Sequence, residues 1–233
     1  YQLELLASAS FDMACLINIS PDHLDRHGDM AGYVAAKRRI FAGAGRQSEA
    51  VIASDDDYTR AIADELDRAG GRHLTRVAVA GGAADVTVTN GILFERGVPA
   101  MDLNGVATLL GRHNWQNAAM AYAVARRLGL SSDTIAKYLP TYPGLPHRQE
   151  LVANIDGIRF INDSKATNAE AAARALDCYE TIYWIAGGLA KAGGLSGLEP
   201  WYSRIVEAYL VCAAAEPFAR SLNGHVPHRH AGD

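Results

Sequence analysis

Residues 20–27, with the sequence SPDHLDRH, place two histidines and two aspartates directly after a short apolar run. The apolar run, residues 15–19, predicts a buried strand, and loops at the ends of such strands carry function in α/β enzymes. His23 and the nearby acids could therefore ligate a metal ion or contact a phosphate. The alternative is a polar loop whose aspartates cap a helix. No glutamate follows His23, as the HExxH zinc motif requires, so we do not expect zinc.

Lys37 falls in the middle of an apolar face on a helix predicted over residues 33–41. The apolar residues that share this face, at roughly 100° per residue, are Tyr33, Val34, Ile40 and Phe41. An inward ammonium group is costly unless it is paired or loses its proton, and a desolvated lysine becomes a nucleophile. The alternative is a side chain whose stem covers the face while its charge reaches water.

Two asparagines mark the start of an Ala-rich helix predicted over residues 114–128. We expect Asn114 to be the N-cap of this helix, with Asn117 one turn further along. Amide side chains offer both a donor and an acceptor, so the pair could also recognise the edge of a nucleobase. The alternative is a helix cap without any further role.

Residues 162–168, with the sequence NDSKATN, end a predicted strand and open a predicted helix. Lys165, Thr167 and the helix start together favour an anion, and Asp163 could hold a ribose hydroxyl. The alternative is a capped helix with Thr167 or Asn168 as its N-cap.

A glycine-rich stretch, residues 187–194, follows another predicted strand and contains Lys191. Glycines let the backbone approach a ligand, but a flexible linker has the same composition. The phosphate-binding pattern GxxxxGK[ST] does not occur in the sequence.

Strands that alternate with helices must position these residues, and this order predicts an α/β fold with open, mostly parallel sheets. Asn90-Gly91 and Asp156-Gly157 predict two β-hairpins. The stiff segment at residues 143–146, PGLP, predicts the boundary between two domains. The remaining predicted elements are strands at 50–53, 181–186 and 209–211, a β-rich stretch at 76–103, and helices from 55–57 onward and at 131–139, 169–176, 199–207 and 217–222.

The composition is that of a globular protein, with 49% hydrophobic and 21% charged residues. A net charge of -4 argues against a nucleic-acid-binding surface. The three cysteines are far apart and form no CxxC pair, which favours a reducing cytosol over a disulfide framework. The first residues do not resemble a signal peptide, and there is no apolar run of 18 residues, so we expect no membrane span.

In combination these stretches resemble the Mur ligase family, and within it the D-glutamate-adding members. The resemblance covers nearly the whole chain in the right order. It rests on YQLE at residues 1–4, NISPDHLDRH at 18–27 with Tyr33 and Lys37, HNxxN at 113–117, GLPHR at 144–148 and NDSKATN at 162–168. The last segment is the most specific, because sister ligases, including those resembling folylpolyglutamate synthase, carry other residues there.

The resemblance implies a cytoplasmic, ATP-dependent ligase of peptidoglycan synthesis. Such a ligase phosphorylates the carboxylate of UDP-N-acetylmuramoyl-L-alanine, and the amine of D-glutamate then attacks the acyl phosphate to form an amide. ATP and Mg²⁺ are the implied cofactors, and we expect a monomer without nucleic-acid or membrane partners. Residues 1–143 would be the second part of the central ATP-binding domain, without its P-loop. Residues 144–233 would be the first part of a Rossmann-like C-terminal domain. We expect such a fragment to be inactive by itself.

The resemblance also implies a role for each candidate residue. His23 would ligate magnesium, and Lys37, converted by carbon dioxide into a carbamate, would support that catalytic site. This would turn an inward cation into an anion that faces the metal. The contacts to ATP would come from Asn114, Asn117, Arg148 and Asp163, and those to the D-glutamate carboxylates from Lys165, Thr167 and Lys191.

One departure from the family pattern is Cys212-Ala213-Ala214, where we expect a glycine at a strand end. The alternative function is a non-catalytic module of the same fold that binds a nucleotide or a partner protein. A P-loop encoded upstream of residue 1 would favour the enzyme over the module.

Overall fold

The structure, a computed structural model, describes residues 2–5, 9–42, 48–191 and 193–232. The chain divides into two compact units, residues 1–142 and residues 143–233, and each has its own core. None of the helices in the described ranges is long and apolar enough to cross a bilayer.

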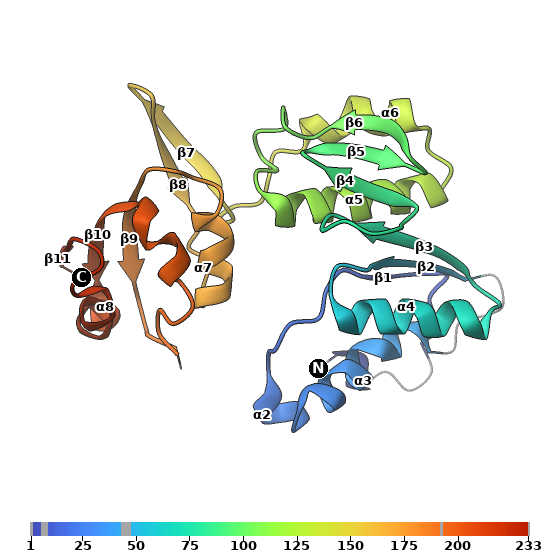
Figure 1. The fold of residues 1–233 in the computed structure, drawn as a ribbon, viewed down its shortest axis with the longest axis horizontal. Coiled ribbons are helices and arrows are strands. Elements are labelled where there is room, and N and C mark those ends of the chain that lie inside the picture. The colour runs from blue at the N-terminus through green and yellow to red at the C-terminus, as the bar shows by residue number, and fades with distance from the viewer. Residues whose placement is uncertain (1, 6–8, 43–47, 192, 233) are drawn as a thin grey trace. The chain divides into compact units, whose positions relative to one another are not determined.

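The first unit is built on a six-stranded sheet in the order β1-β2-β3-β4-β5-β6 (Figure 1). Strands β1 to β4 are parallel, and β5 and β6 are added antiparallel. The sheet is therefore mixed, with the predicted parallel part at one side. The strands are β1 (Met13–Leu16), β2 (Glu49–Ala53), β3 (His73–Ala78), β4 (Val86–Thr89), β5 (Ile92–Glu95) and β6 (Val98–Asp102).

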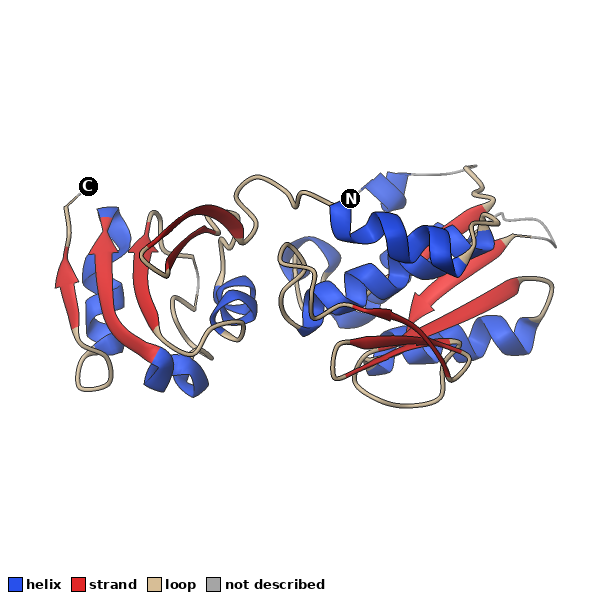
Figure 2. Cartoon of the chain, turned by 90° about the horizontal axis from the view of Figure 1, so that it is seen from above, coloured by secondary structure: helices blue, strands red, loops and turns tan. Residues whose placement is uncertain are grey.

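Helices cover both faces of this sheet (Figure 2). Alternate residues of β2 show why: Val51 and Ala53 are buried in the core on the α5 side, whereas Ala50 and Ile52 are buried in the core with α3 and α4. The helical elements of the unit are α1 (Gln2–Leu5), α2 (Leu24–His27), α3 (Met30–Arg38), η1 (Arg39–Phe41), α4 (Asp57–Ala69), α5 (Arg112–Arg127), α6 (Ser132–Tyr138) and η2 (Leu139–Thr141).

The prediction that Asn114 caps α5 is wrong. The helix begins at Arg112, and its N-cap is Gly111, whose φ of 86° is a conformation that glycine adopts at little cost. Asn114 is therefore the third residue of the helix, and its Nδ2 donates a hydrogen bond to the Leu110 carbonyl at 2.9 Å.

The second unit contains a hairpin and a small parallel sheet. Strands β7 (Glu150–Ile155) and β8 (Ile158–Asn162) form the hairpin, and the sheet has the order β11-β10-β9. Its apolar core joins one face of this sheet to α7, η3 and α8. The other elements are α7 (Ala169–Leu176), β9 (Ile182–Gly187), η3 (Glu199–Arg204), β10 (Ile205–Val211), η4 (Cys212–Ala214), α8 (Ala215–Leu222) and β11 (His228–His230).

The predicted helix at residues 199–207 is also wrong. A 3₁₀ helix ends at Arg204, and β10 begins at Ile205. Two β-branched residues, Ile205 and Val206, start this strand, and Ile205 is buried in the core. Strand pairing with β9 therefore takes precedence over the helical pattern.

Both predicted hairpin turns are confirmed. Asn90 and Gly91 have φ values of 50° and 77°, and Asp156 and Gly157 have values of 51° and 84°. Positive φ at two successive residues is the geometry that joins twisted antiparallel strands with the shortest loop.

Replacing Gly91 by alanine should destabilise the first unit more than replacing Gly97, which lies in a similar turn with a φ of 80°. Both substitutions force a left-handed residue, at a cost of about 1–2 kcal/mol. At Gly91 the new Cβ would also come within 2.2 Å of Asn104 Oδ1, and Asn104 would lose its hydrogen bond to the Asn90 carbonyl. Urea unfolding of the two variants, followed by circular dichroism, measures the difference. Equal losses would show that Asn104 moves aside without cost.

Candidate functional site

His23 lies in the loop between β1 and α2 and is the N-cap of α2, with left-handed φ and ψ of 51° and 33°. Its ring is largely exposed, and its Nε2 is 3.4 Å from Asp22 Oδ2. Asp22 also accepts a hydrogen bond from the His23 backbone N–H at 3.0 Å. The imidazole is therefore accessible to a ligand and is oriented by the adjacent carboxylate.

Lys37 is half-buried on α3, on the face predicted for it. Tyr33 and Phe41 on this face are buried, and Lys37 Nζ lies 5.3 Å from the centre of the Tyr33 ring. The His27 ring lies 5.3 Å from the same tyrosine. Tyr33 therefore contacts one residue of the SPDHLDRH segment and the lysine one turn further along α3.

Two aspartates that the sequence analysis did not single out connect the strand ends of this sheet. Asp56 accepts hydrogen bonds from the N–H groups of Ile19, beyond β1, and Thr59, in the first turn of α4. Asp55 accepts hydrogen bonds from the end of β3 and from Gln116 of α5. Both aspartates directly follow a predicted buried strand, and this position is the signal by which they could have been found.

Asn114 and Asn117 form an amide pair in the first turns of α5. Asn117 Nδ2 donates to Asn114 Oδ1 at 3.4 Å, and Asn114 in turn donates to the Leu110 carbonyl. Asn117 is exposed, and these bonds use one of its donor hydrogens and leave its carbonyl oxygen as an acceptor for a ligand.

Asp163 follows β8 and is half-buried beside the connector, residues 143–149, which precedes β7. Its Oδ1 accepts a hydrogen bond from the Gln149 backbone N–H at 3.0 Å. Burial raises the pKa of the Asp163 carboxyl above its ordinary value, and the hydrogen bond from Gln149 and the charge of Arg148 only partly oppose this effect. The Arg148 side chain is exposed.

The connector is fastened to the loop that follows β8. His147 accepts a hydrogen bond at its carbonyl from the Lys165 N–H at 3.0 Å, and its Nδ1 lies 2.9 Å from Asn162 Nδ2. The His147 N–H donates to Glu150 Oε2 at 2.8 Å. His147 and Gln149 both have left-handed φ values, 64° and 45°, and such residues persist where surrounding contacts hold them. The sequence analysis named Asn162 as part of the NDSKATN segment but did not single out Glu150.

Thr167 and Lys191 come together from the ends of β8 and β9. Lys191 Nζ lies 3.4 Å from Thr167 Oγ1, and Lys165 is exposed on the same loop as Thr167. Asn168, one of the two predicted caps, is the N-cap of α7, and its side chain accepts a hydrogen bond from the Ala171 N–H. Two ammonium groups and a hydroxyl near the start of a helix can hold carboxylates.

The other reactive side chains do not add to these groups. Cys15, Cys178 and Cys212 are free thiols, and burial raises the pKa of Cys178 to about 11. Within the described ranges, no three His, Cys, Asp or Glu side chains lie close enough together to hold a metal ion. His23 would therefore need ligands of other types, or from elsewhere, to bind a metal.

Comparison with known proteins identifies relatives of both units. Residues 1–125 match the Mur ligase middle domain. The UDP-N-acetylmuramoylalanine--D-glutamate ligase of Rhodospirillum rubrum is 52% identical over 240 residues, which cover 100% of this chain and 50% of the relative. The protein of the same name from Caulobacter vibrioides strain NA1000 is 49% identical over 230 residues, which cover 96% of this chain and 49% of the relative. The chain thus spans about half the length of the curated relatives that it matches.

Solved structures of more distant proteins share the fold. The UDP-N-acetylmuramate-alanine ligase MurC of Thermotoga maritima has a TM-score of 0.71 at 15% identity, covering 96% of this chain and 52% of that one. MurF of Thermotoga maritima, solved in complex with ADP, has a TM-score of 0.60 at 18% identity, covering 89% of this chain and 51% of that one. These matches confirm the predicted α/β fold.

Replacing Asp163 by asparagine should raise the free energy of unfolding at pH 7. The raised pKa means that the folded protein binds this proton more tightly than the unfolded chain, so the ionised carboxylate destabilises the fold at neutral pH. An asparagine keeps an oxygen for the Gln149 N–H and carries no charge. The gain should shrink as the pH falls through the raised pKa, because Asp163 is then protonated as well.

Urea unfolding at pH 7 and at pH 4 measures this effect. Glu180→Gln, at an exposed carboxylate outside these loops, is the control and should show no such gain. A gain for Asp163→Asn that is the same at both pH values would contradict the argument from burial.

Proposed function

Because this chain belongs to the Mur ligase family, we propose that it is part of an ATP-dependent ligase that adds D-glutamate to UDP-N-acetylmuramoyl-L-alanine in peptidoglycan synthesis. The names of its curated relatives support this reaction. The observation that supports the proposal most is the contact between Lys191 Nζ and Thr167 Oγ1, on the loop that also bears Lys165. A dicarboxylic amino acid such as D-glutamate needs more than one anion contact. ATP and the uridine nucleotide place this reaction in the cytoplasm, and we propose a monomer.

The domain assignment follows from the same proposal. Residues 1–143 would be the second part of the central ATP-binding domain, and residues 144–233 the first part of the C-terminal domain. The sequence contains no GxxxxGK[ST] pattern, so we assign the binding of the ATP phosphates to a part of the ligase outside these residues.

In this proposal the first turns of α5 bind the nucleotide. Asn114 and Asn117 contact adenine through the donor and acceptor groups of their amides. Arg148 and Asp163 would also contact the nucleotide. The exposure of Asn117 and Arg148 supports this assignment, because both side chains are accessible to a ligand.

His23 and Lys37 would support magnesium. A magnesium ion neutralises charge on the transferring phosphoryl group and on the acyl phosphate. His23 offers an accessible imidazole, and Lys37 offers a carboxylate once its neutral amine has added carbon dioxide and released a proton. Magnesium prefers oxygen ligands. The Lys37 carbamate would supply such a ligand, the His23 nitrogen would be a less preferred one, and other parts of the ligase and water would supply the rest.

Lys165, Thr167 and Lys191 would hold the two carboxylates of D-glutamate while its amine attacks the acyl phosphate. The protein then contributes mostly position and charge neutralisation. The hydrogen bond from the Lys165 N–H to the His147 carbonyl fixes the backbone of this loop. The side chains of Lys165 and Thr167 therefore start from a fixed backbone.

The first test of the proposal concerns Lys37. In the full-length ligase, Lys37→Ala should remove most of the activity, because the carboxylate of the carbamate is lost. A small added carboxylate such as acetate should restore part of it by occupying the vacated space. The control is Lys137→Ala, since Lys137 also lies over a tyrosine ring, Tyr138, at 5.2 Å but on α6. Near-normal turnover of Lys37→Ala would show that Lys37 has no catalytic role.

The second test concerns Lys165. Lys165→Ala should raise the KM for D-glutamate, because one charge-assisted contact contributes roughly 1.5–3 kcal/mol, or about one to two powers of ten in affinity. The KM for ATP should change little. Steady-state kinetics in which each substrate is varied in turn measures both constants. Arg174→Ala, at the other end of α7, is the control. A change confined to ATP would reassign this loop to the nucleotide.

A further inference from the structure

Asp55 connects three elements at one edge of the first sheet. It follows β2, and its Oδ1 accepts hydrogen bonds from the N–H groups of Val79 and Ala80, just beyond β3, at 2.8 and 2.6 Å. Its Oδ2 accepts a hydrogen bond from Gln116 Nε2, on α5, at 2.7 Å. Hydrogen bonds to an ionised carboxylate are stronger than those between neutral groups, and these three bonds engage both oxygens of Asp55.

Gln116 is the α5 partner in this contact. Its side chain is only 9% exposed, so the amide depends on a protein partner for its hydrogen bonds. It directly precedes Asn117 and lies two residues after Asn114 in the first half of the helix. A shift of Gln116 would therefore move both asparagines with it.

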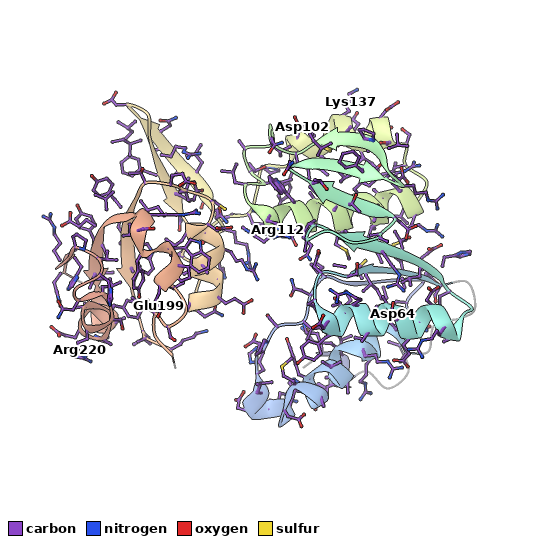
Figure 3. All side chains as sticks on the ribbon, in the orientation of Figure 1. Asp64, Asp102, Arg112, Lys137, Glu199 and Arg220 are labelled. Carbon is purple, nitrogen blue, oxygen red and sulfur yellow. The ribbon has the colours of Figure 1, made fainter. Side chains whose placement is uncertain are left out.

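In the first half of α5 the other contacts with the sheet are mostly apolar and non-directional. The polar contacts of Tyr122 and Arg126 with Glu95, and of Arg127 with Glu49, lie in the second half of the helix. Small residues, Ala118, Ala119 and Ala123, are buried on its inner face, and burial of such side chains favours contact without fixing the rotation or the axial position of a helix. A second polar contact acts in the same place: Arg112 Nε, in the first turn of α5 (Figure 3), donates to the Val79 carbonyl at 3.1 Å. The polar contacts at this end therefore determine where the first turns of the helix lie.

We propose that Asp55 and Gln116 are positioning residues for the nucleotide base: their hydrogen bond sets the rotation of α5 so that Asn114 and Asn117 present their amides to adenine. This inference rests on the proposed function, because it needs the two asparagines to contact the base. Asp55 acts through Gln116 and the β3 loop and does not touch the ligand.

The test uses the full-length ligase with Gln116→Glu, which sets a second carboxylate against Asp55. The KM for ATP should rise roughly tenfold, the effect expected when one charge-assisted bond is lost. The preference for ATP over GTP should fall, because the two nucleotides differ only in the base. The kcat at saturating ATP and the KM for D-glutamate should stay within about twofold, since the Lys165 loop belongs to the other unit.

A second substitution should reverse the effect. In the double variant Asp55→Asn/Gln116→Glu, the new amide can accept from Val79 and Ala80 through its oxygen and donate to the new carboxylate through its nitrogen. The KM for ATP and the preference for ATP should return towards the original values. If the Gln116→Glu protein does not fold, Gln116→Met removes the bond without adding charge and should raise the KM for ATP in the same way.

A matched control separates positioning from general loss of stability. Tyr122 lies further along α5, and its hydroxyl forms hydrogen bonds with Glu95 at 3.0 Å and Ser132 at 2.9 Å. Tyr122→Phe removes both bonds. It should lower the unfolding temperature without a change in the KM for ATP. An equal rise in KM for Tyr122→Phe would overturn the inference, and so would a double variant that recovers nothing.

Asn117→Ala distinguishes this inference from the proposed function. If Asn117→Ala leaves the KM for ATP unchanged, the adenine site is wrong and both proposals fail. If Asn117→Ala raises that KM but neither Gln116→Glu nor Gln116→Met does so, only the positioning role of Asp55 and Gln116 is wrong.

Discussion

Parallel pairing of β1, β2 and β3 is the constraint on which the positions of the candidate residues in the first unit depend. Parallel strands run in the same direction, so the loops that follow them meet at one edge of the sheet. His23, Asp55 and the residues after Ala78 are far apart in the sequence, and each follows one of these strands. Strand β5 runs the other way, and β6, antiparallel to β5, runs again in the direction of β1 to β4, so the chain after β6 returns to this edge and leads into α5.

Carboxylates that accept hydrogen bonds from backbone N–H groups hold these loops in place. Asp56 joins the loop after β1 to the start of α4, and Asp55 joins the loop after β3 to α5. Asp163 and Glu150 do the same in the second unit for the connector. A carboxylate suits this role because its two oxygens accept several hydrogen bonds and each of these bonds is charge-assisted. These four acids therefore act as acceptors that hold loops and helix starts in place.

The sequence predicted those features that depend on local chemistry. Asn90-Gly91 and Asp156-Gly157 determine their turns by themselves, because few other pairs adopt positive φ twice in succession. The α/β class followed from the alternation of strands and helices. The start of α5 was mispredicted because Gly111, a glycine with positive φ, is the N-cap in place of Asn114. The strand at Ile205 was mispredicted because its pairing with β9 is a non-local interaction.

The contacts that shape the candidate sites were beyond the reach of sequence patterns for the same reason. Asp55 and Gln116 are 61 positions apart, and nothing local to either residue indicates the other. The sequence could name Asn114 and Asn117 from a motif, but not the bond that orients their helix. The same holds for Lys165, whose backbone N–H donates a hydrogen bond to the carbonyl of His147 in the connector.

Directional bonds at the edges and non-directional packing in the cores have different consequences for function. The cores hold each unit together through many small contacts, and loss of one apolar contact lowers stability without a specific change in geometry. The edge contacts are few, and each one orients a particular helix or loop. The proposed ligase reaction depends on alignment of its substrates, because a displacement of about 1 Å can cost two powers of ten in rate. Variants of Asp55 and Gln116 should therefore change substrate constants before they change the stability of the fold, whereas variants of the core should do the reverse.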